Sequence, residues 1–321
     1  MKKQALICAL LATVLLPGCS EDGENTPQPT DGRVALEATS GIRMNTRAYD
    51  KTWEAGDAIG IYMLNGDATD GNGNRKYTTA QTAENGSFTA AEGQTIYFPV
   101  DASQRDFVAY YPYRETLADG NVYTVDVSVQ TPQKDIDLMG AAKVEGKDKT
   151  DPKVAFVFTH KLVKLDITIK ADGTSLTDAD LAGTTVSISN QQTAATYNVV
   201  TGGDATVTTG TTKEIVLHTD GLKAEGIVLP AASTAGMALT FTVPGLEGQA
   251  FHWDVNSAAQ SKAFVAGSKY LYTITISKAG VEVSSKVEDW TPGNGGGETG
   301  NADVKAMSHA SDETDVIIKL A

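Results

Sequence analysis

The sequence contains very few of the residues that build cysteine-based or histidine-based sites. Only two cysteines and four histidines occur among 321 residues, and both cysteines, Cys8 and Cys19, fall near the start of the chain. A disulfide framework needs several cysteines spread through the fold, and a structural zinc site needs clustered Cys or His. The composition therefore excludes a disulfide scaffold and a cysteine-rich zinc domain.

Positive charge is also scarce. The chain has 26 Lys and Arg against 40 Asp and Glu, which gives a formal net charge of −14. Because such an acidic surface repels phosphate backbones, we expect no nucleic-acid partner. Hydrophobic residues make up 41% of the chain, which is enough for a packed core and argues against disorder. The length suggests one large or two small domains.

Recognisable catalytic and ligand-binding motifs are missing. The sequence has no GxSxG, no P-loop and no EF-hand loop. The four histidines show no metal-ligand spacing: His160, His218, His252 and His309. We therefore predict no catalytic residue, no metal site and no cofactor, and expect that the protein is not an enzyme. Residues 67–74 (DATDGNGN) leave two readings open, weak calcium binding or a solvated hairpin turn, of which the turn is favoured.

The beginning of the chain has the pattern of a bacterial export signal. A short positive start precedes an apolar run over residues 5–16, which is too short to span a bilayer as a helix. The run ends in Leu16-Pro17-Gly18-Cys19, which resembles a lipobox. We predict a lipoprotein signal peptide at residues 1–18 and acylation of Cys19, hence an outer membrane lipoprotein precursor. An ordinary secretory signal is the alternative.

The remainder of the chain has a β pattern. Residues 20–32 are polar and acidic and are typical of a flexible tether. Beyond them, short runs rich in Thr, Val, Ile and Tyr recur between turn clusters. Residues 165–169 and 271–276 alternate with a period of two, whereas no window has convincing helical spacing. This spacing of strands and turns predicts an all-β fold of β-sandwiches.

Two breaks divide the β pattern. The charged stretch at residues 145–153 predicts a boundary between an N-terminal sandwich, residues 48–150, and a C-terminal sandwich, residues 151–292. Gly-rich sequence then begins a hinge, so that residues 293–321 combine a hinge with an apolar strand at the end of the chain. A strand on a hinge cannot satisfy its own backbone groups, so it must pair with its own sheet or with another molecule.

Several phrases in order, behind the lipobox, resemble the fimbrillin-like proteins of Bacteroides and relatives, which are subunits of the type V pilus. The phrases are WEAGDAIGIYM (53–63), YYPY (110–113), DLM (137–139), FTHKLVKL (158–165) and VEDW (287–290). We interpret them as fold markers, since none looks like a catalytic constellation. The resemblance implies two transthyretin-like β-sandwich domains in tandem, other pilin subunits as partners and a location in a cell-surface fimbrium.

The resemblance also implies a processing pathway. Pilins of this family are exported as lipoproteins and cut by an arginine-specific protease, and a strand from a neighbour then fills the exposed groove. The matching cleavage candidates here are Arg47, which we favour, and Arg43. Cleavage after Arg47 would remove residues 19–47, which comprise the lipidated tether and a strand at residues 34–36. Arg33 is a less suitable cleavage site, because the strand at residues 34–36 would then stay attached to the fold. The alternative for these arginines is ordinary surface charge.

The C-terminal segment is the matching candidate for the donor strand. Its residues are Val316, Ile317, Ile318, Lys319 and Leu320. Val316, Ile318 and Leu320 would face one way and could fill pockets of a neighbour, unless this strand closes its own domain. Because the sequence offers candidates for both a removable N-terminal strand and a donor strand, a stalk pilin is favoured. The alternatives are a tip adhesin and a non-polymerising surface lipoprotein that binds glycan or host ligand through an exposed aromatic platform.

Overall fold

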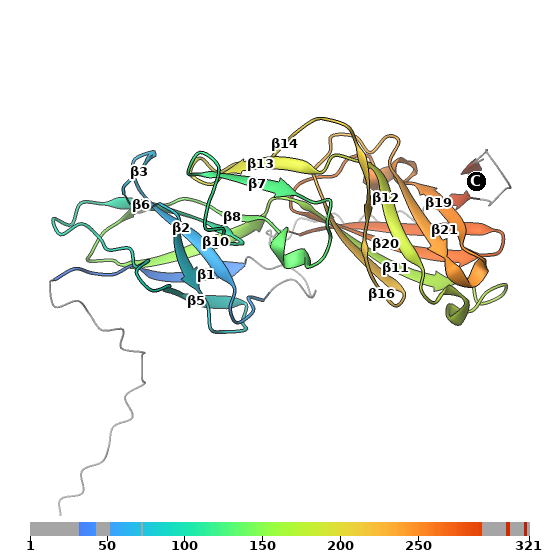
Figure 1. Ribbon diagram of the computed structural model, residues 1–321, viewed down its shortest axis with the longest axis horizontal. Helices are drawn as coiled ribbons and strands as arrows, with labels where there is room; N and C mark the ends of the chain where they lie inside the picture. Colours follow the sequence, from blue (N-terminus) through green and yellow to red (C-terminus); the bar gives the residue numbers. More distant parts are fainter. Residues whose placement is uncertain (1–31, 43–51, 72, 291–305, 309–317, 320–321) are drawn as a thin grey trace, which may run out of the picture.

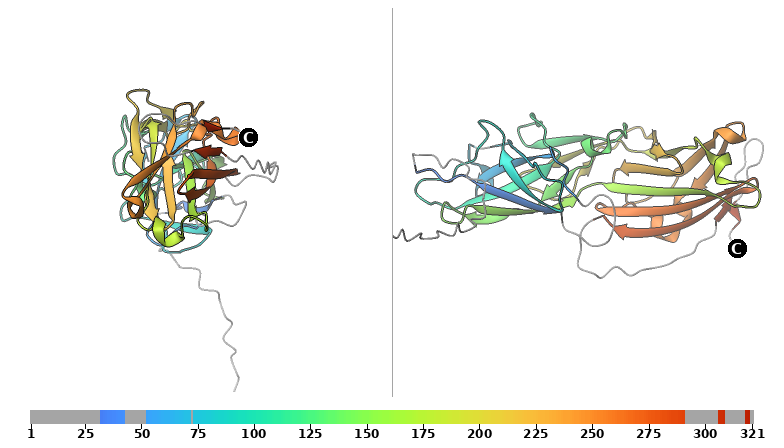
Figure 2. Two further views of the ribbon diagram at one scale, coloured as in Figure 1. Left: turned by 90° about the vertical axis from the view of Figure 1, so that its right-hand side faces the viewer. Right: turned by 90° about the horizontal axis from the view of Figure 1, so that it is seen from below.

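The structure is a computed structural model that describes residues 32–42, 52–71, 73–290, 306–308 and 318–319. Over these residues it contains strands and short 3-10 turns and no α-helix, so the predicted all-β class is confirmed. The molecule is elongated, with the N-terminal strands at one end and the C-terminal strands at the other (Figures 1 and 2). The strands form four sheets, of nine, seven, four and three strands.

The nine-stranded sheet forms a closed ring. Strand β2 pairs with both β4 and β6, which closes the circuit β2-β4-β5-β1-β10-β8-β6. One face of every strand in this ring contributes to a single apolar core, which we call the ring core and which includes Trp53, Ile61 and Phe156. β3 and β9 lie outside this circuit, attached to β2 and β6. The nine strands of the sheet are β1 (Glu37–Ile42), β2 (Ala58–Asn65), β3 (Ala68–Thr69), β4 (Arg75–Thr78), β5 (Asn85–Ala90), β6 (Arg105–Tyr111), β8 (Met139–Ala141), β9 (Val144–Lys147) and β10 (Lys153–His160).

Two further sheets pack on each other in the other half of the molecule. The seven-stranded sheet consists of β16 (His218–Asp220), β17 (Lys223–Val228), β11 (Val163–Ala171), β20 (Ser268–Ser277), β21 (Gly280–Asp289), β22 (Ala306–Ser308) and β23 (Ile318–Lys319). The four-stranded sheet consists of β15 (Lys213–Val216), β12 (Thr185–Gln191), β18 (Ala238–Val243) and β19 (Gln249–Asp254). Both contribute to a second apolar core, in which the rings of Trp253 and Tyr272 meet at 5.2 Å.

The three-stranded sheet joins the two halves. It pairs β7 (Val122–Asp126) with β13 (Ala194–Asn198), which also pairs with β14 (Thr206–Val207). β7 and β13 lie across the middle of the molecule (Figure 1). They cover the outer face of β2 and β6, where Tyr110 meets Tyr123 at 5.6 Å. The second core therefore runs continuously from the C-terminal sheets to the outside of the ring.

The charged stretch at residues 145–153 is a connection inside one sheet. It links β9 to β10, and β10 pairs with β1 and β8 in the nine-stranded sheet. The ring therefore continues past residue 150, where the sequence predicted a boundary, to His160. Exposed turns and domain linkers share a polar, Pro-containing composition, so composition alone could not separate the two. The remaining short elements are the 3-10 turns η1 (Gln133–Asp135), η2 (Asp178–Leu181), η3 (Pro244–Leu246), η4 (Val255–Ser257) and η5 (Ala259–Ser261).

Closure of the ring between β2 and β6 depends on one glycine. Gly60 lies directly opposite Tyr110, and a Cβ atom added to Gly60 would lie 2.1 Å from Cε1 of the Tyr110 ring. The Tyr110 hydroxyl is held in place because it donates to Asn74 Oδ1 at 2.6 Å. The tyrosine ring therefore fills the space that a side chain at position 60 would need.

We predict that Gly60→Ala lowers the free energy of unfolding by about 2–3 kcal/mol, because an added methyl group forces a buried ring to move. The matched control is Gly210→Ala, since nothing lies within 4 Å of a Cβ atom at that position. Urea denaturation of the two variants measures the difference. Equal stability of both variants would contradict the close packing of Tyr110 on Gly60.

Candidate functional site

Strand β1 has a paired neighbour on each side within the ring, although it is the first strand of the chain. It runs parallel to β10 on one side and antiparallel to β5 on the other. Its side chains alternate, with Leu36, Ala38 and Ser40 buried and Glu37 and Thr39 exposed. Because both neighbours hydrogen-bond to it, β1 completes the backbone pairing of β5 and β10 as well as the ring core.

The N-terminal strand is longer than the sequence predicted. Before β1, residues 34–36 form an isolated bridge with residues 96–98, since Leu36 N donates to Ile96 O at 2.9 Å and Phe98 N donates to Val34 O at 3.0 Å. Strand β1 follows directly and ends at Ile42. Sequence reasoning missed this part because EATSGI is small and polar. The signal that could have found it is the period-two row of Val34, Leu36 and Ala38.

The candidate cleavage sites fall between β1 and the next described residues. Arg43 and Arg47 lie outside the described residues, as does Cys19. β1 ends at Ile42, and the chain is described again from Thr52, next to Trp53 in the ring core. A cut after either arginine would therefore separate β1 from the rest of the chain. Arg33 precedes the strand, with its guanidinium 4.3 Å from the centre of the Tyr97 ring.

The C-terminal strand is placed far from β1. Ile318 and Lys319 form β23, which pairs with β22 at the edge of the seven-stranded sheet. Val316, Ile317 and Leu320 lie outside the described residues. β23 and β1 lie toward opposite ends of the long axis (Figure 2). The structure therefore does not bring the two candidate strands together within one molecule.

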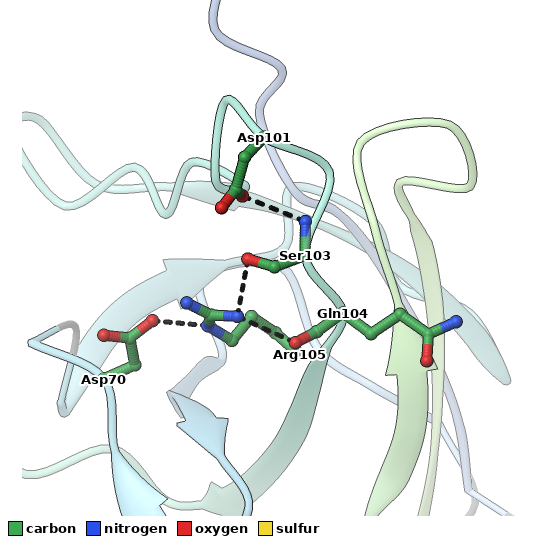
Figure 3. A network of polar contacts seen from close by, with 5 residues as sticks. All are labelled: Asp70, Asp101, Ser103, Gln104 and Arg105. Atoms are coloured by element: carbon green, nitrogen blue, oxygen red, sulfur yellow. Dashed lines mark hydrogen bonds and ion pairs between the residues drawn. The ribbon is translucent and has the colours of Figure 1, made fainter.

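The loop at residues 67–74 is engaged in ion pairs and hydrogen bonds. Arg105 Nε donates to Asp70 Oδ2 at 2.5 Å, and Arg105 Nη1 donates to Ser103 Oγ and Gln104 O (Figure 3). Lys143 Nζ lies 3.1 Å from Asp67 Oδ1. Among the described residues, no group of three or more His, Cys, Asp or Glu is arranged to hold a metal ion. Both carboxylates of this loop therefore face cationic side chains of the protein itself.

The three tryptophans are buried. Trp53 is 1% exposed, Trp253 4% and Trp290 8%. Trp53 packs edge-on against the rings of Phe88 at 5.1 Å and Phe158 at 5.3 Å. An exposed platform for stacking a glycan chain is therefore not built from tryptophan.

A cavity of about 170 Å³ lies where the ring meets the C-terminal half. The phrases that carry the family resemblance converge on it, since each contributes lining residues: Trp53, Glu54 and Asp57; Tyr111; Asp137 and Met139; His160 and Lys164; and Trp290. The other lining residues are Thr52, Gln133, Lys134 and Ile227. The convergence of these distant segments was not predictable, because each phrase was interpreted only as a local fold marker.

His160 connects the two halves at this cavity. Its Nδ1 lies 2.7 Å from Asp137 Oδ1, and its ring stacks on Trp290 with centroids 3.9 Å apart and planes at 10°. Trp290 follows β21 of the C-terminal half, whereas His160 ends β10 of the ring. Nearby, burial raises the pKa of Asp57 although Glu54 N and the Tyr111 hydroxyl both donate to its carboxylate. The stack on Trp290 connects the two halves, and the hydrogen bond to Asp137 fixes the His160 ring for it.

We predict that His160→Ala lowers the free energy of unfolding by about 2–4 kcal/mol, because the variant loses a buried stack and leaves Asp137 without its partner. Thermal unfolding should shift downward by about 5–10 °C. His218→Ala is the matched control, since that side chain is exposed and should change stability by less than about 0.5 kcal/mol. Similar midpoints for both variants would mean that the His160–Trp290 stack does not stabilise the junction.

Comparison with known proteins gives a consistent set of relatives. A crystal structure of a candidate cell adhesion protein from Bacteroides uniformis ATCC 8492 is 97% identical, covers 82% of this chain and 100% of its own, and superposes with a TM-score of 0.78. A candidate cell adhesion protein from Bacteroides ovatus ATCC 8483 is 20% identical over 82% of this chain and 99% of its own, with a TM-score of 0.64. The second likeness shows the fold alone.

The match to a family model covers most of the described chain. A model of the fimbrillin-like family matches residues 46–290, which includes the ring from β2 onward, the three-stranded sheet and the junction cavity. Among the residues that the structure describes, none forms a helix long and apolar enough to cross a membrane. The chain belongs to the fimbrillin-like family.

Proposed function

We propose that this chain is a stalk subunit of a type V pilus that polymerises by strand exchange. In this proposal it is exported as a lipoprotein acylated at Cys19 and held at the outer membrane. An arginine-specific protease then cuts after Arg47 or Arg43, and the freed subunit joins a cell-surface fimbrium that supports adhesion. Membership of the fimbrillin-like family supports the proposal, as does the similar protein from Bacteroides uniformis, described as a candidate cell adhesion protein.

The observation that carries the proposal is that β1 is paired on both sides, with β5 and with β10. This strand precedes both candidate arginines, yet β5 and β10 depend on it for their pairing. If β1 leaves after cleavage, two strand edges and the ring core are exposed together. Exposed edges and apolar surface of this kind bind another strand readily. The subunit would thus be inert before cleavage and able to accept a neighbour's strand after it.

The side chains of β1 suit a strand that is later replaced. Two of its buried positions carry small residues, Ala38 and Ser40, and the buried Ser40 Oγ has no hydrogen-bond partner among the described residues. An unsatisfied buried hydroxyl costs about 1–3 kcal/mol. A replacing strand with an apolar side chain at the Ser40 position would avoid that cost. β1 is therefore held between β5 and β10 less tightly than a strand with larger apolar side chains at these positions would be.

The C-terminal segment supports the role of donor. Among the residues that the structure describes, Ile318 and Lys319 form β23 at the edge of the seven-stranded sheet, where they pair with β22. In the described strand order β23 comes last, so its release would break the pairing with β22 alone. Val316, Ile318 and Leu320 repeat with the same spacing of two as Leu36, Ala38 and Ser40. A neighbour's C-terminal strand could therefore present its apolar row to the ring core in place of β1.

We predict that limited digestion of a chain beginning at Ser20 with an arginine-specific protease gives one main cut, after Arg47 or Arg43, followed by a ladder of oligomers. Denaturing gels, native gels and N-terminal sequencing measure the cut and the assembly. The double variant Arg43→Gln/Arg47→Gln should stay uncut and monomeric. Deletion of residues 315–321 should permit the cut but abolish the ladder. Cleavage without oligomers in the intact chain would exclude the stalk role.

A disulfide between β1 and β5 should block assembly after cleavage. Thr39 and Ser87 are directly opposite in the antiparallel pair and both are exposed. Opposite residues of such a pair have Cα atoms about 4.5–5.5 Å apart, which is within the range of a disulfide. A chain beginning at Ser20 contains no other cysteine. We expect oxidised Thr39→Cys/Ser87→Cys to be cut and to remain monomeric.

Reduction of the same cleaved protein with dithiothreitol should restore the ladder, because β1 can then leave. The single variant Thr39→Cys is the matched control and should assemble with or without reductant. Assembly of the oxidised double variant at the wild-type rate would show that β1 need not leave its place between β5 and β10, and would contradict the exchange mechanism.

A further inference from the structure

The cavity at the junction has hydrogen-bond donors that lack acceptors. Nε1 of Trp53, Nε2 of Gln133 and Nε1 of Trp290 are buried and have no partner among the described residues, and all three residues line the cavity. A buried N–H without an acceptor is costly and uncommon in folded proteins. Three of them around one cavity indicate that an oxygen-bearing molecule belongs there.

The charges around the cavity restrict what that molecule can be. Asp57 and Asp137 line the cavity, together with Glu54. Of the cations in the lining, Lys164 Nζ lies 3.2 Å from Glu225 Oε2, His160 is bonded to Asp137, and Lys134 is exposed to solvent. Carboxylates repel an anion but accept hydrogen bonds from hydroxyl groups. A neutral hydroxyl satisfies both kinds of group, since it accepts from the N–H donors and donates to the carboxylates.

The size and the walls of the cavity fit a six-membered ring. Cavities of roughly 150 Å³ hold benzene, so a volume of about 170 Å³ accommodates a ring of that size. Aromatic side chains, those of Trp53, Tyr111 and Trp290, supply part of the lining. Apolar walls with a few placed polar groups are typical of small-molecule sites, which occur preferentially between domains.

We propose that the junction cavity binds one neutral pyranose unit, held by the N–H groups of Trp53, Gln133 and Trp290 and by the carboxylates of Asp57 and Asp137. The site is a partly open pocket with room for a single sugar unit and differs from an exposed platform for a glycan chain. It lies outside the pairing of β1 with β5 and β10, so it does not rest on cleavage or assembly. Adhesion through a sugar would give the subunit a binding function of its own.

The test uses the uncut chain and saturation-transfer difference NMR. The probes are the methyl α-pyranosides of D-galactose, D-glucose, D-mannose and L-fucose, with N-acetylneuraminic acid as an anionic counterpart. We expect at least one neutral pyranoside to give a saturable signal and the anionic sugar to bind more weakly. Absence of a saturable signal from all four neutral probes, or tighter binding of N-acetylneuraminic acid, would overturn the proposal.

Variants connect the signal to the cavity. Trp290→Phe keeps an aromatic ring against His160 but removes the N–H donor, and Gln133→Ala removes a second donor at a partly exposed position. Each should weaken binding about threefold to tenfold, the loss expected for one hydrogen bond. Trp253→Phe is the matched control, because its Nε1 is also buried without a partner but does not line the cavity. Binding that is unchanged in both Trp290→Phe and Gln133→Ala would place the sugar elsewhere and overturn the assignment.

Discussion

Closure of the nine-stranded sheet through β1 is the constraint on which the N-terminal half depends. A closed sheet leaves no free edge only while every neighbouring pair is complete. Here β1 comes first in the fold and is inserted between β5 and β10, with parallel pairing on one side and antiparallel pairing on the other. The same strand also places Leu36 and Ala38 in the ring core. Backbone pairing and core packing are therefore completed by a short segment that lies next to the candidate processing sites.

Three connections hold the second half of the molecule to this ring. The three-stranded sheet crosses the middle by pairing β7 with β13, so backbone hydrogen bonds connect segments that flank the junction. At the cavity, His160 of the ring stacks on Trp290, which follows the last long strand. Gln130 adds a third connection, because its side-chain amide exchanges hydrogen bonds with the backbone of Ile227. A rearrangement of β1 can thus leave the junction intact.

The features that could be predicted from the sequence are local ones. The alternation at residues 165–169 and 271–276 correctly predicted strands, now seen in β11 and β20, because a two-residue period is a property of the segment itself. The extent of β1 was missed because its residues are small and polar. The charged stretch before β10 was misleading, since it joins two strands of one sheet. The cavity depends on the meeting of five distant segments, which no local pattern encodes.

The direction of β1 within the molecule has a mechanical consequence. β1 runs roughly along the long axis (Figure 1), while β23 lies near the far end of that axis. Tension applied between the two ends of the subunit would act along a strand seated between β5 and β10. Its hydrogen bonds would then be loaded together in shear and would have to break almost simultaneously, whereas a strand lying across the axis would be peeled away one bond at a time. The fold is therefore oriented to resist pulling along its length.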